Sequence, residues 1–216
     1  MIKKIFNYLL SLLFPLECLG CKKEDTYLCS KCLEKIEINN NFKFKGELKY
    51  LDGIYSATKY DNKLVQKAIH YFKFRYIKKL AKPLTEILIK YLKQEKIDLT
   101  ECILIPIPLN KKRYLERGFN QSEIIANYLA QRFNLRVCNN VLIRTRNTPH
   151  QVGLSKAKRS TNLNDAFEVI NTENICNKKI ILIDDVVTTG STLEEAAKTL
   201  KKTKVSQIIA LTLAHD

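Results

Sequence analysis

An apolar run that ends in two acids and a cluster of hydroxyls is the strongest chemical signal in this sequence. Residues 180–193 read Ile-Ile-Leu-Ile-Asp-Asp-Val-Val-Thr-Thr-Gly-Ser-Thr-Leu. A helix that begins near Gly190 would leave the N–H groups of its first turn unpaired, and together with the helix dipole these attract phosphate. The segment therefore predicts a phosphate-binding loop. The hydroxyls that could add hydrogen bonds are those of Thr188, Thr189, Ser191 and Thr192.

Asp184 and Asp185 lie where the apolar run ends, and this position suggests a second task. Ligands of open α/β sheets bind at the carboxyl ends of the strands. Two carboxylates there can accept hydrogen bonds from the vicinal hydroxyls of a ribose, or hold Mg²⁺ through its waters. The segment contains no Lys, which excludes a Walker nucleotide loop. The alternative is a helix after a strand, with the acids serving only as caps.

Four cysteines form two Cys-x-x-Cys pairs, Cys18 with Cys21 and Cys29 with Cys32. Four thiolates suit a tetrahedral structural Zn²⁺, although the spacing between the pairs is shorter than in many zinc ribbons. Disulfides would be favoured only in an exported chain, and an iron–sulfur cluster is a further alternative. We expect a structural zinc module. The scattered cysteines, Cys102, Cys138 and Cys176, are expected to be small buried side chains.

The elements that must position these residues alternate between apolar strands and amphipathic helices. Helical patterns cover about 62–72, 78–96, 121–133 and 191–202. Strand patterns lie near 50–60, 102–106, 136–143, 165–170, 179–184 and 206–213. Continuous apolar strands separated by such helices predict an α/β fold, with a parallel sheet covered by helices on both faces.

Length and charge are consistent with a folded protein that binds polyanions. The 216 residues, 45% of them hydrophobic, suffice for one domain and a small module. The net charge of +15 favours phosphorylated small molecules, nucleic acid or anionic membranes, or it reflects a lysine-rich surface without a binding role.

The N-terminal apolar run, residues 5–14, resembles the core of a signal peptide, but it is too short to span a membrane. Cleavage beside Cys21 would also destroy the first cysteine pair. We therefore expect a helix stopped by Pro15, no membrane span and a cytoplasmic location.

Segment 180–193 resembles the ribose-5-phosphate loop of type I phosphoribosyltransferases, and further motifs resemble the ComF family. These motifs are Phe14-Pro15 before Cys18, Ile105-Pro106-x-Pro108, Arg117-Gly118-Phe119-Asn120-Gln121, and Gln151-x-x-Leu154 with Arg159 and Asn162. The resemblance covers nearly the whole chain. It implies that phosphoribosyl pyrophosphate (PRPP) binds with Mg²⁺, with Asp184 and Asp185 as catalytic residues on the ribose hydroxyls. The phosphate would be held by Val186, Thr188, Thr189, Gly190, Ser191 and Thr192.

The same resemblance assigns roles to two basic segments. Residues 106–121 correspond to a pyrophosphate loop, with candidates Arg113, Arg117, Gly118, Asn120 and Gln121. Residues 144–162 correspond to a flexible loop that closes over the substrate, with candidates Arg144, Gln151, Lys156, Arg159 and Asn162. Such a lid would exclude water from an oxocarbenium-like sugar. Either segment could instead be a solvated basic surface, and His150 is either a general acid or base or simply solvated.

A basic stripe runs from residue 59 to residue 82, with eight Lys or Arg, one acid and five interleaved aromatics. Cations beside aromatics suit single-stranded DNA, through attraction to the backbone and stacking on the bases. Alternatively, the aromatics belong to a helix pair and pack inward. The phosphoribosyltransferase resemblance would also make this region the hood over C1′ of the sugar.

Three hypotheses follow for a chain divided into a helix and zinc module over 1–40 and a phosphoribosyltransferase-like domain over 41–216. The first is a PRPP-binding protein with transfer of a phosphoribosyl group. The second is a non-catalytic single-stranded DNA-binding uptake factor that PRPP regulates. The third is a structural partner of other proteins. The ComF resemblance implies a role in DNA uptake during natural transformation, with a competence helicase and other uptake proteins as partners.

Overall fold

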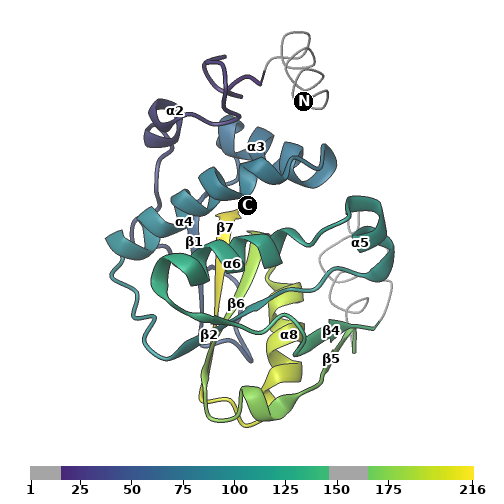
Figure 1. The fold of residues 1–216 in the computed structure, drawn as a ribbon. Coiled ribbons are helices and arrows are strands. Elements are labelled where there is room, and N and C mark those ends of the chain that lie inside the picture. The colour runs from purple at the N-terminus through teal and green to yellow at the C-terminus, as the bar shows by residue number, and fades with distance from the viewer. Residues whose placement is uncertain (1–15, 146–164) are drawn as a thin grey trace.

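A five-stranded parallel sheet forms the centre of the computed structural model, which describes residues 16–145 and 165–216 (Figure 1). The strand order is β1-β7-β6-β2-β3, and all four pairings are parallel. The strands are β1 (Gly53–Lys59), β7 (Gln207–His215), β6 (Lys179–Val187), β2 (Cys102–Pro106) and β3 (Arg136–Val137). The predicted parallel sheet, with helices on both faces, is confirmed.

One face of the sheet is covered by α3 (Lys63–Phe74), the 3-10 turn η1 (Lys78–Leu80), α4 (Ala81–Gln94) and α6 (Gln121–Phe133). The side chain of Asn62 caps α3 by accepting hydrogen bonds from the N–H groups of Leu64 and Val65. Apolar residues at helical spacing, such as Leu84 and Leu88 of α4, are fully buried against the sheet. Their burial stabilises the fold by roughly 1.5–3 kcal/mol for each side chain.

The opposite face is covered by α8 (Ser191–Lys201) and by an antiparallel pair, β4 (Leu142–Arg144) and β5 (Phe167–Val169). The prediction of a single strand near 136–143 is therefore wrong. The chain leaves the main sheet after β3 and turns through two asparagines before β4 begins. The strand expected near 165–170 exists as β5, but it pairs with β4 and not with the parallel sheet.

A short helix, α5 (Lys111–Arg117), occupies much of the segment expected to be a basic loop. The side chain of Asn110 caps its start, and Gly118 ends it in the left-handed conformation with φ of 69°. No residue of α5 is buried, so the sequence carried no apolar periodicity to reveal it. Cys102 and Cys138 are buried as expected, whereas Cys176 is exposed.

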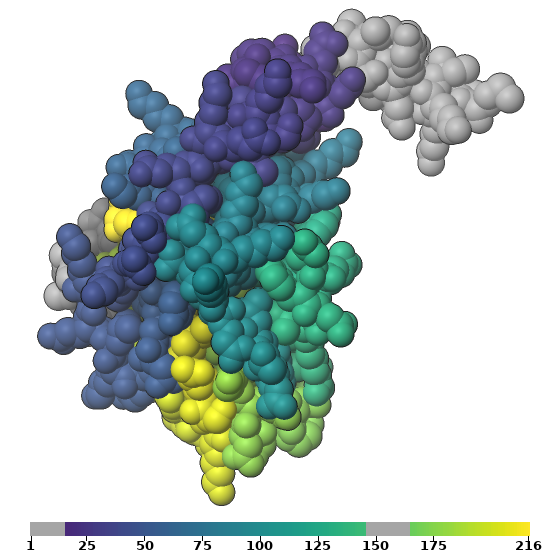
Figure 2. Space-filling model, turned by 90° about the vertical axis from the view of Figure 1, so that its left-hand side faces the viewer, coloured from purple at the N-terminus to yellow at the C-terminus, as the bar shows by residue number. Residues whose placement is uncertain are grey.

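The cysteine segment packs onto the first face, and α2 (Ser30–Glu34) lies within it. Cys18, Cys29 and Cys32 belong to the same buried cluster as α3 and α4. Figure 2 shows this segment in purple, resting on the blue and teal surface of the helices. No helix within residues 16–145 and 165–216 is long and apolar enough to cross a membrane.

The chain between the cysteine segment and the sheet is held along β1. The N–H of Asn39 donates to the carbonyl of Ala57 (2.8 Å), and its side-chain amide donates to the carbonyl of Ser56 (2.8 Å). The hydroxyl of Thr58 donates to the carbonyl of Glu37 (2.8 Å). These bonds fix the orientation of the cysteine segment relative to the sheet.

Candidate functional site

The acid pair lies at the carboxyl end of β6, and the two side chains meet different partners. Asp185 forms an ion pair with Lys73 of α3, with 2.7 Å between Nζ and Oδ1. Asp184 accepts hydrogen bonds on Oδ1 from the hydroxyl of Ser122 (3.1 Å) and from the N–H of Asp185 (2.9 Å). The two carboxylates are thus held by α3 and by the start of α6.

The pKa of Asp184 is raised to about 7, well above the ordinary value for an aspartate. Burial is the largest cause, and the neighbouring charge of Asp185 adds to it. Lys73 and the two hydrogen bonds oppose the shift without cancelling it. Because full charging of both acids is disfavoured, the site gains from a cation or from hydroxyl donors supplied by a ligand.

The hydroxyl-rich loop turns from β6 into α8 as the sequence predicted. Gly190 adopts φ of 74° immediately before α8 and provides no side-chain cap. The hydroxyl of Thr189 accepts a hydrogen bond from the N–H of Ser191 (3.4 Å) and lies 2.9 Å from the hydroxyl of Ser191. These groups are donors that a phosphate could engage, because Thr189 precedes and Ser191 begins an eleven-residue helix whose first N–H groups attract anions.

The start of α6 lies beside the acid pair. Asn120 caps this helix, accepting a hydrogen bond from the N–H of Ser122 (3.1 Å) while its amide donates to the carbonyl of Ile107 (3.0 Å). Gln121 is 1% exposed, and its Nε2 has no hydrogen-bond partner among the residues that the structure describes. A buried amide donor without a partner is costly, so this nitrogen suits a ligand oxygen or a water.

Two arginines from the predicted loops also interact electrostatically with the acids. The charge of Asp185 acts on Arg117, and that of Asp184 acts on Arg144. Burial lowers the pKa of both guanidinium groups. Arg113 is close enough for its charge to act on both arginines. The fold therefore brings the 106–121 segment and the start of the 144–162 segment to the same strand end.

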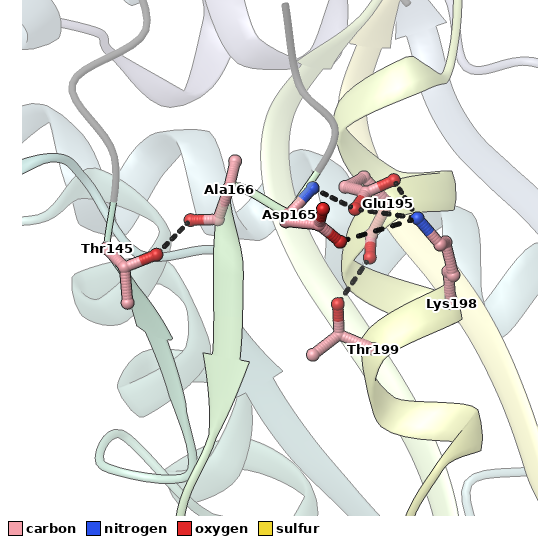
Figure 3. A network of polar contacts seen from close by, with 6 residues as sticks. All are labelled: Thr145, Asp165, Ala166, Glu195, Lys198 and Thr199. Atoms are coloured by element: carbon pink, nitrogen blue, oxygen red, sulfur yellow. Dashed lines mark hydrogen bonds and ion pairs between the residues drawn. The ribbon is translucent and has the colours of Figure 1, made fainter. Parts of the chain in front are cut away.

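The remaining candidates of the second basic segment lie outside the described residues. These are Gln151, Lys156, Arg159 and Asn162, together with His150. Thr145 and Asp165, which flank residues 146–164, are held by hydrogen bonds (Figure 3). Thr145 donates to the carbonyl of Ala166 through its N–H (3.0 Å) and through its hydroxyl (3.4 Å), and the N–H of Asp165 donates to the buried carboxylate of Glu195 on α8 (2.8 Å).

Sequence reasoning did not single out Lys73 or Ser122. Lys73 was one of eight cations in the basic stripe, and only its position next to Phe72, which faces the core, distinguishes it from the others. Ser122 follows Asn120 and Gln121 in the helix cap, where a serine has an ordinary local role. Their contacts with the acids link elements far apart in the chain, which no local pattern indicates.

A second centre is formed by the four cysteines, whose sulfur atoms all lie within 4.8 Å of one another. A tetrahedral Zn²⁺ with Zn–S bonds of about 2.3 Å would place sulfurs about 3.8 Å apart, so a small contraction would complete it. A Cβ added to Gly20 would approach the sulfur of Cys32 to 2.8 Å, so the glycine leaves room for this ligand. The cluster fits a structural metal ion.

The thiols of this cluster differ in how readily they ionise. Burial alone would raise the pKa of Cys18, but hydrogen bonds from the backbone at Cys21, Cys29 and Gly20 outweigh it and lower the pKa to about 6. Burial and the neighbouring cysteines raise the pKa of Cys32 to about 12. A metal ion would allow all four to be thiolates, with release of protons.

We expect Zn²⁺ to bind this cluster and stabilise the protein. Cys32→Ser should lower the zinc content of the purified protein from about one ion per chain and reduce its melting temperature by several degrees, because the metal links the module to the α3 core. Elemental analysis and thermal unfolding measure the two effects. Cys176→Ser, at an exposed cysteine outside the cluster, is the control, and equal zinc content in both variants would contradict the assignment.

The raised pKa of Asp184 predicts a pH-dependent stability of the ligand-free protein. In the unfolded chain this acid ionises near pH 4, but in the folded chain only near pH 7, so its contribution to stability is lost as pH rises through that window. Asp184→Asn should therefore raise the melting temperature at pH 8 by several degrees and change it little at pH 4. Glu47→Gln, at an exposed acid, is the control. An equal effect of Asp184→Asn at both pH values would refute the prediction.

Comparisons with known proteins agree with this geometry. Residues 119–216 match the family described as the phosphoribosyl transferase domain. Competence protein F of Haemophilus influenzae is 37% identical over 113 residues, which are 52% of this chain and 49% of the relative. Competence protein ComFC of Bacillus subtilis is 36% identical over 115 residues, covering 53% and 45%. DNA utilization protein YhgH of Escherichia coli is 37% identical over 97 residues, covering 45% and 42%.

The chain spans about half the length of the curated relatives it matches. Among solved structures, the glutamine phosphoribosylpyrophosphate amidotransferase of Bacillus subtilis, in complex with ADP and GMP, gives a TM-score of 0.44 at 13% identity. That alignment covers 68% of this chain and 30% of the other. The domain match and the sequence identities agree with the resemblance seen in the motifs, and over about half of its length this chain is similar to ComF-type proteins and to the phosphoribosyl transferase domain.

Proposed function

We propose that this protein binds PRPP with Mg²⁺ and acts in DNA uptake. The main support for PRPP binding is the end of β6, where two acids and a hydroxyl-rich loop lead into the start of α8. The 5-phosphate would lie on the loop around Gly190, and Asp184 and Asp185 would receive the ribose hydroxyls. The role in uptake rests on the relatives, whose names refer to competence and DNA utilization.

The donor set at the strand end suits Mg²⁺. Two carboxylates and the hydroxyl of Ser122 offer the oxygen ligands that this ion prefers, either directly or through waters. Mg²⁺ would neutralise charge on the pyrophosphate, while Arg117 and the start of α6 would bind its oxygens. The buried amide nitrogen of Gln121 would donate to the same group.

The arrangement also supports phosphoribosyl transfer. In that reaction the C1′–O bond breaks and its electron pair leaves with pyrophosphate. A nucleophilic atom of an acceptor molecule then bonds to C1′ and releases its proton to water. Arg117, Arg144 and the helix starts would stabilise the charge that develops on the leaving group, which is the task of preorganised cations and dipoles.

Calorimetric titration with PRPP and Mg²⁺ tests the proposal. Wild-type protein should bind with micromolar affinity, and the ligand at about a hundred times its Kd should stabilise the fold by about 2.7 kcal/mol. Asp184→Asn/Asp185→Asn should abolish binding, because the ribose hydroxyls and Mg²⁺ lose their acceptors. Glu47→Gln should bind as the wild type does. Absence of binding by the folded wild-type protein would overturn the proposal.

A second function, binding of single-stranded DNA, is favoured by the surface of the basic stripe. Phe72 is fully buried, but Phe74 and Tyr76 are 47% and 49% exposed, so the aromatics do not all pack inward. Their rings lie among exposed cations at the end of α3 and in η1, and these can attract phosphates while bases stack on the rings. The exposed cations of the stripe are Lys59, Lys63, Lys67, Arg75, Lys78, Lys79 and Lys82.

We expect Phe74→Ala/Tyr76→Ala to weaken binding of an oligothymidylate by about tenfold or more, since stacking contributes roughly 1–3 kcal/mol per base. Fluorescence anisotropy at several salt concentrations measures the affinity and its salt dependence. Ile170→Ala removes an exposed apolar side chain after β5 and serves as the control. An affinity insensitive to salt, or equal in all variants, would remove this function.

A further inference from the structure

We propose that Lys73, on α3, is the residue through which the hood region binds the pyrophosphate of PRPP. Its ammonium would bridge Asp185 and the pyrophosphate oxygens. This inference rests on the proposed PRPP site and adds a binding residue to it, taken from outside both predicted loops.

The ion pair between Lys73 and Asp185 is largely withdrawn from solvent. Its atoms are 2.7 Å apart, and the two side chains are 20% and 10% exposed. A buried ion pair adds little net stability compared with apolar residues of the same volume, because both charges lose their hydration. Its presence beside a second carboxylate therefore calls for a role other than stability.

The end of α3 and the following turn η1 are fixed to the 117–119 segment by three ring contacts. The rings of Phe72 and Phe119 lie 5.5 Å apart, and the guanidinium of Arg117 lies 5.4 Å from the centre of the Phe74 ring. The ammonium of Lys78 lies 5.0 Å from the centre of the Phe119 ring. Lys73 is thus held next to the segment that would bind pyrophosphate.

The ammonium of Lys73 has hydrogen-bonding capacity left for a ligand. A lysine side chain has three donors, and within residues 16–145 and 165–216 the ion pair with Asp185 is its one polar contact. The guanidinium of Arg117 packs on the ring of Phe74, the residue after Lys73, and its charge interacts with that of Asp185, so a pyrophosphate placed near Arg117 would lie near Lys73. Asp185 would then orient the ammonium and partly offset its cost of burial.

The test compares three probes, each titrated with Mg²⁺ by calorimetry: PRPP, pyrophosphate and ribose 5-phosphate. Lys73→Met should lower the affinity of the protein for PRPP and for pyrophosphate by about tenfold or more, as expected for the loss of a hydrogen bond to a charged group. Ribose 5-phosphate lacks the pyrophosphate, so its affinity should stay within about twofold of the wild type. Lys93→Met, in the last turn of α4 and exposed, is the matched control.

Lys73→Met leaves Asp185 without its cation, and such a variant can fail to fold. The comparison is therefore repeated between Asp185→Asn and Asp185→Asn/Lys73→Met, which contain no unpaired buried carboxylate at this position. In that background the loss of Lys73 should still weaken pyrophosphate binding.

The outcomes separate this inference from the proposed function. Failure of the wild-type protein to bind PRPP would overturn both. Binding of PRPP by the wild type and equally well by Lys73→Met would overturn only the role of Lys73. An equal loss of affinity for ribose 5-phosphate and pyrophosphate would also overturn it, because Lys73 would then act only by holding Asp185.

Discussion

Two adjacent carboxylates at the end of a buried strand impose the constraint on which this structure depends. Asp184 and Asp185 cannot both carry a charge in a poorly solvated place unless other groups compensate for it. The ammonium of Lys73, the hydroxyl of Ser122 and the charges of Arg117 and Arg144 all act on this pair. Elements from four separate parts of the chain converge there for that reason.

This compensation is incomplete, as the raised pKa of Asp184 indicates. The acid pair is incompletely neutralised and lies beside the start of α8. This arrangement lowers the stability of the free protein, but it suits a ligand that brings hydroxyls, a phosphate and a cation. Acids with a raised pKa and uncompensated charge are common at functional sites, where ligand binding compensates the charge. PRPP with Mg²⁺ would supply all three groups, which is the physical basis of the proposed function.

The cysteine centre supports the same region from a distance. Its buried cysteines pack with the helices that cover the first face of the sheet, and α3 carries Lys73 to the acid pair. A metal ion would fix the module, and through shared packing it would help to keep α3 in place. The aromatics that extend from the end of α3, Phe74 and Tyr76, connect this region to the exposed basic surface.

Local sequence determined most of the helices and strands and pointed to the candidate site at the end of β6. The buried strand β6, its two acids and the glycine before α8 follow from apolar run length, chemical type and turn chemistry, all of which act over a few residues. Helix α6 was predicted with its observed bounds, because its apolar spacing and its cap are also local. The pairing of the four cysteines into one cluster followed from their short spacing in the same way.

Tertiary structure decided what the sequence pattern could not express. Helix α5 has no buried face, so periodicity could not reveal it, and the split of the 136–143 segment into β3 and β4 depends on which sheet each part joins. The pairing of Lys73 with Asp185, 112 positions further along the chain, arises only when α3 packs over the strand ends. Such contacts depend on the balance of burial and charge across the whole fold, and neither quantity is encoded within any short stretch of the chain.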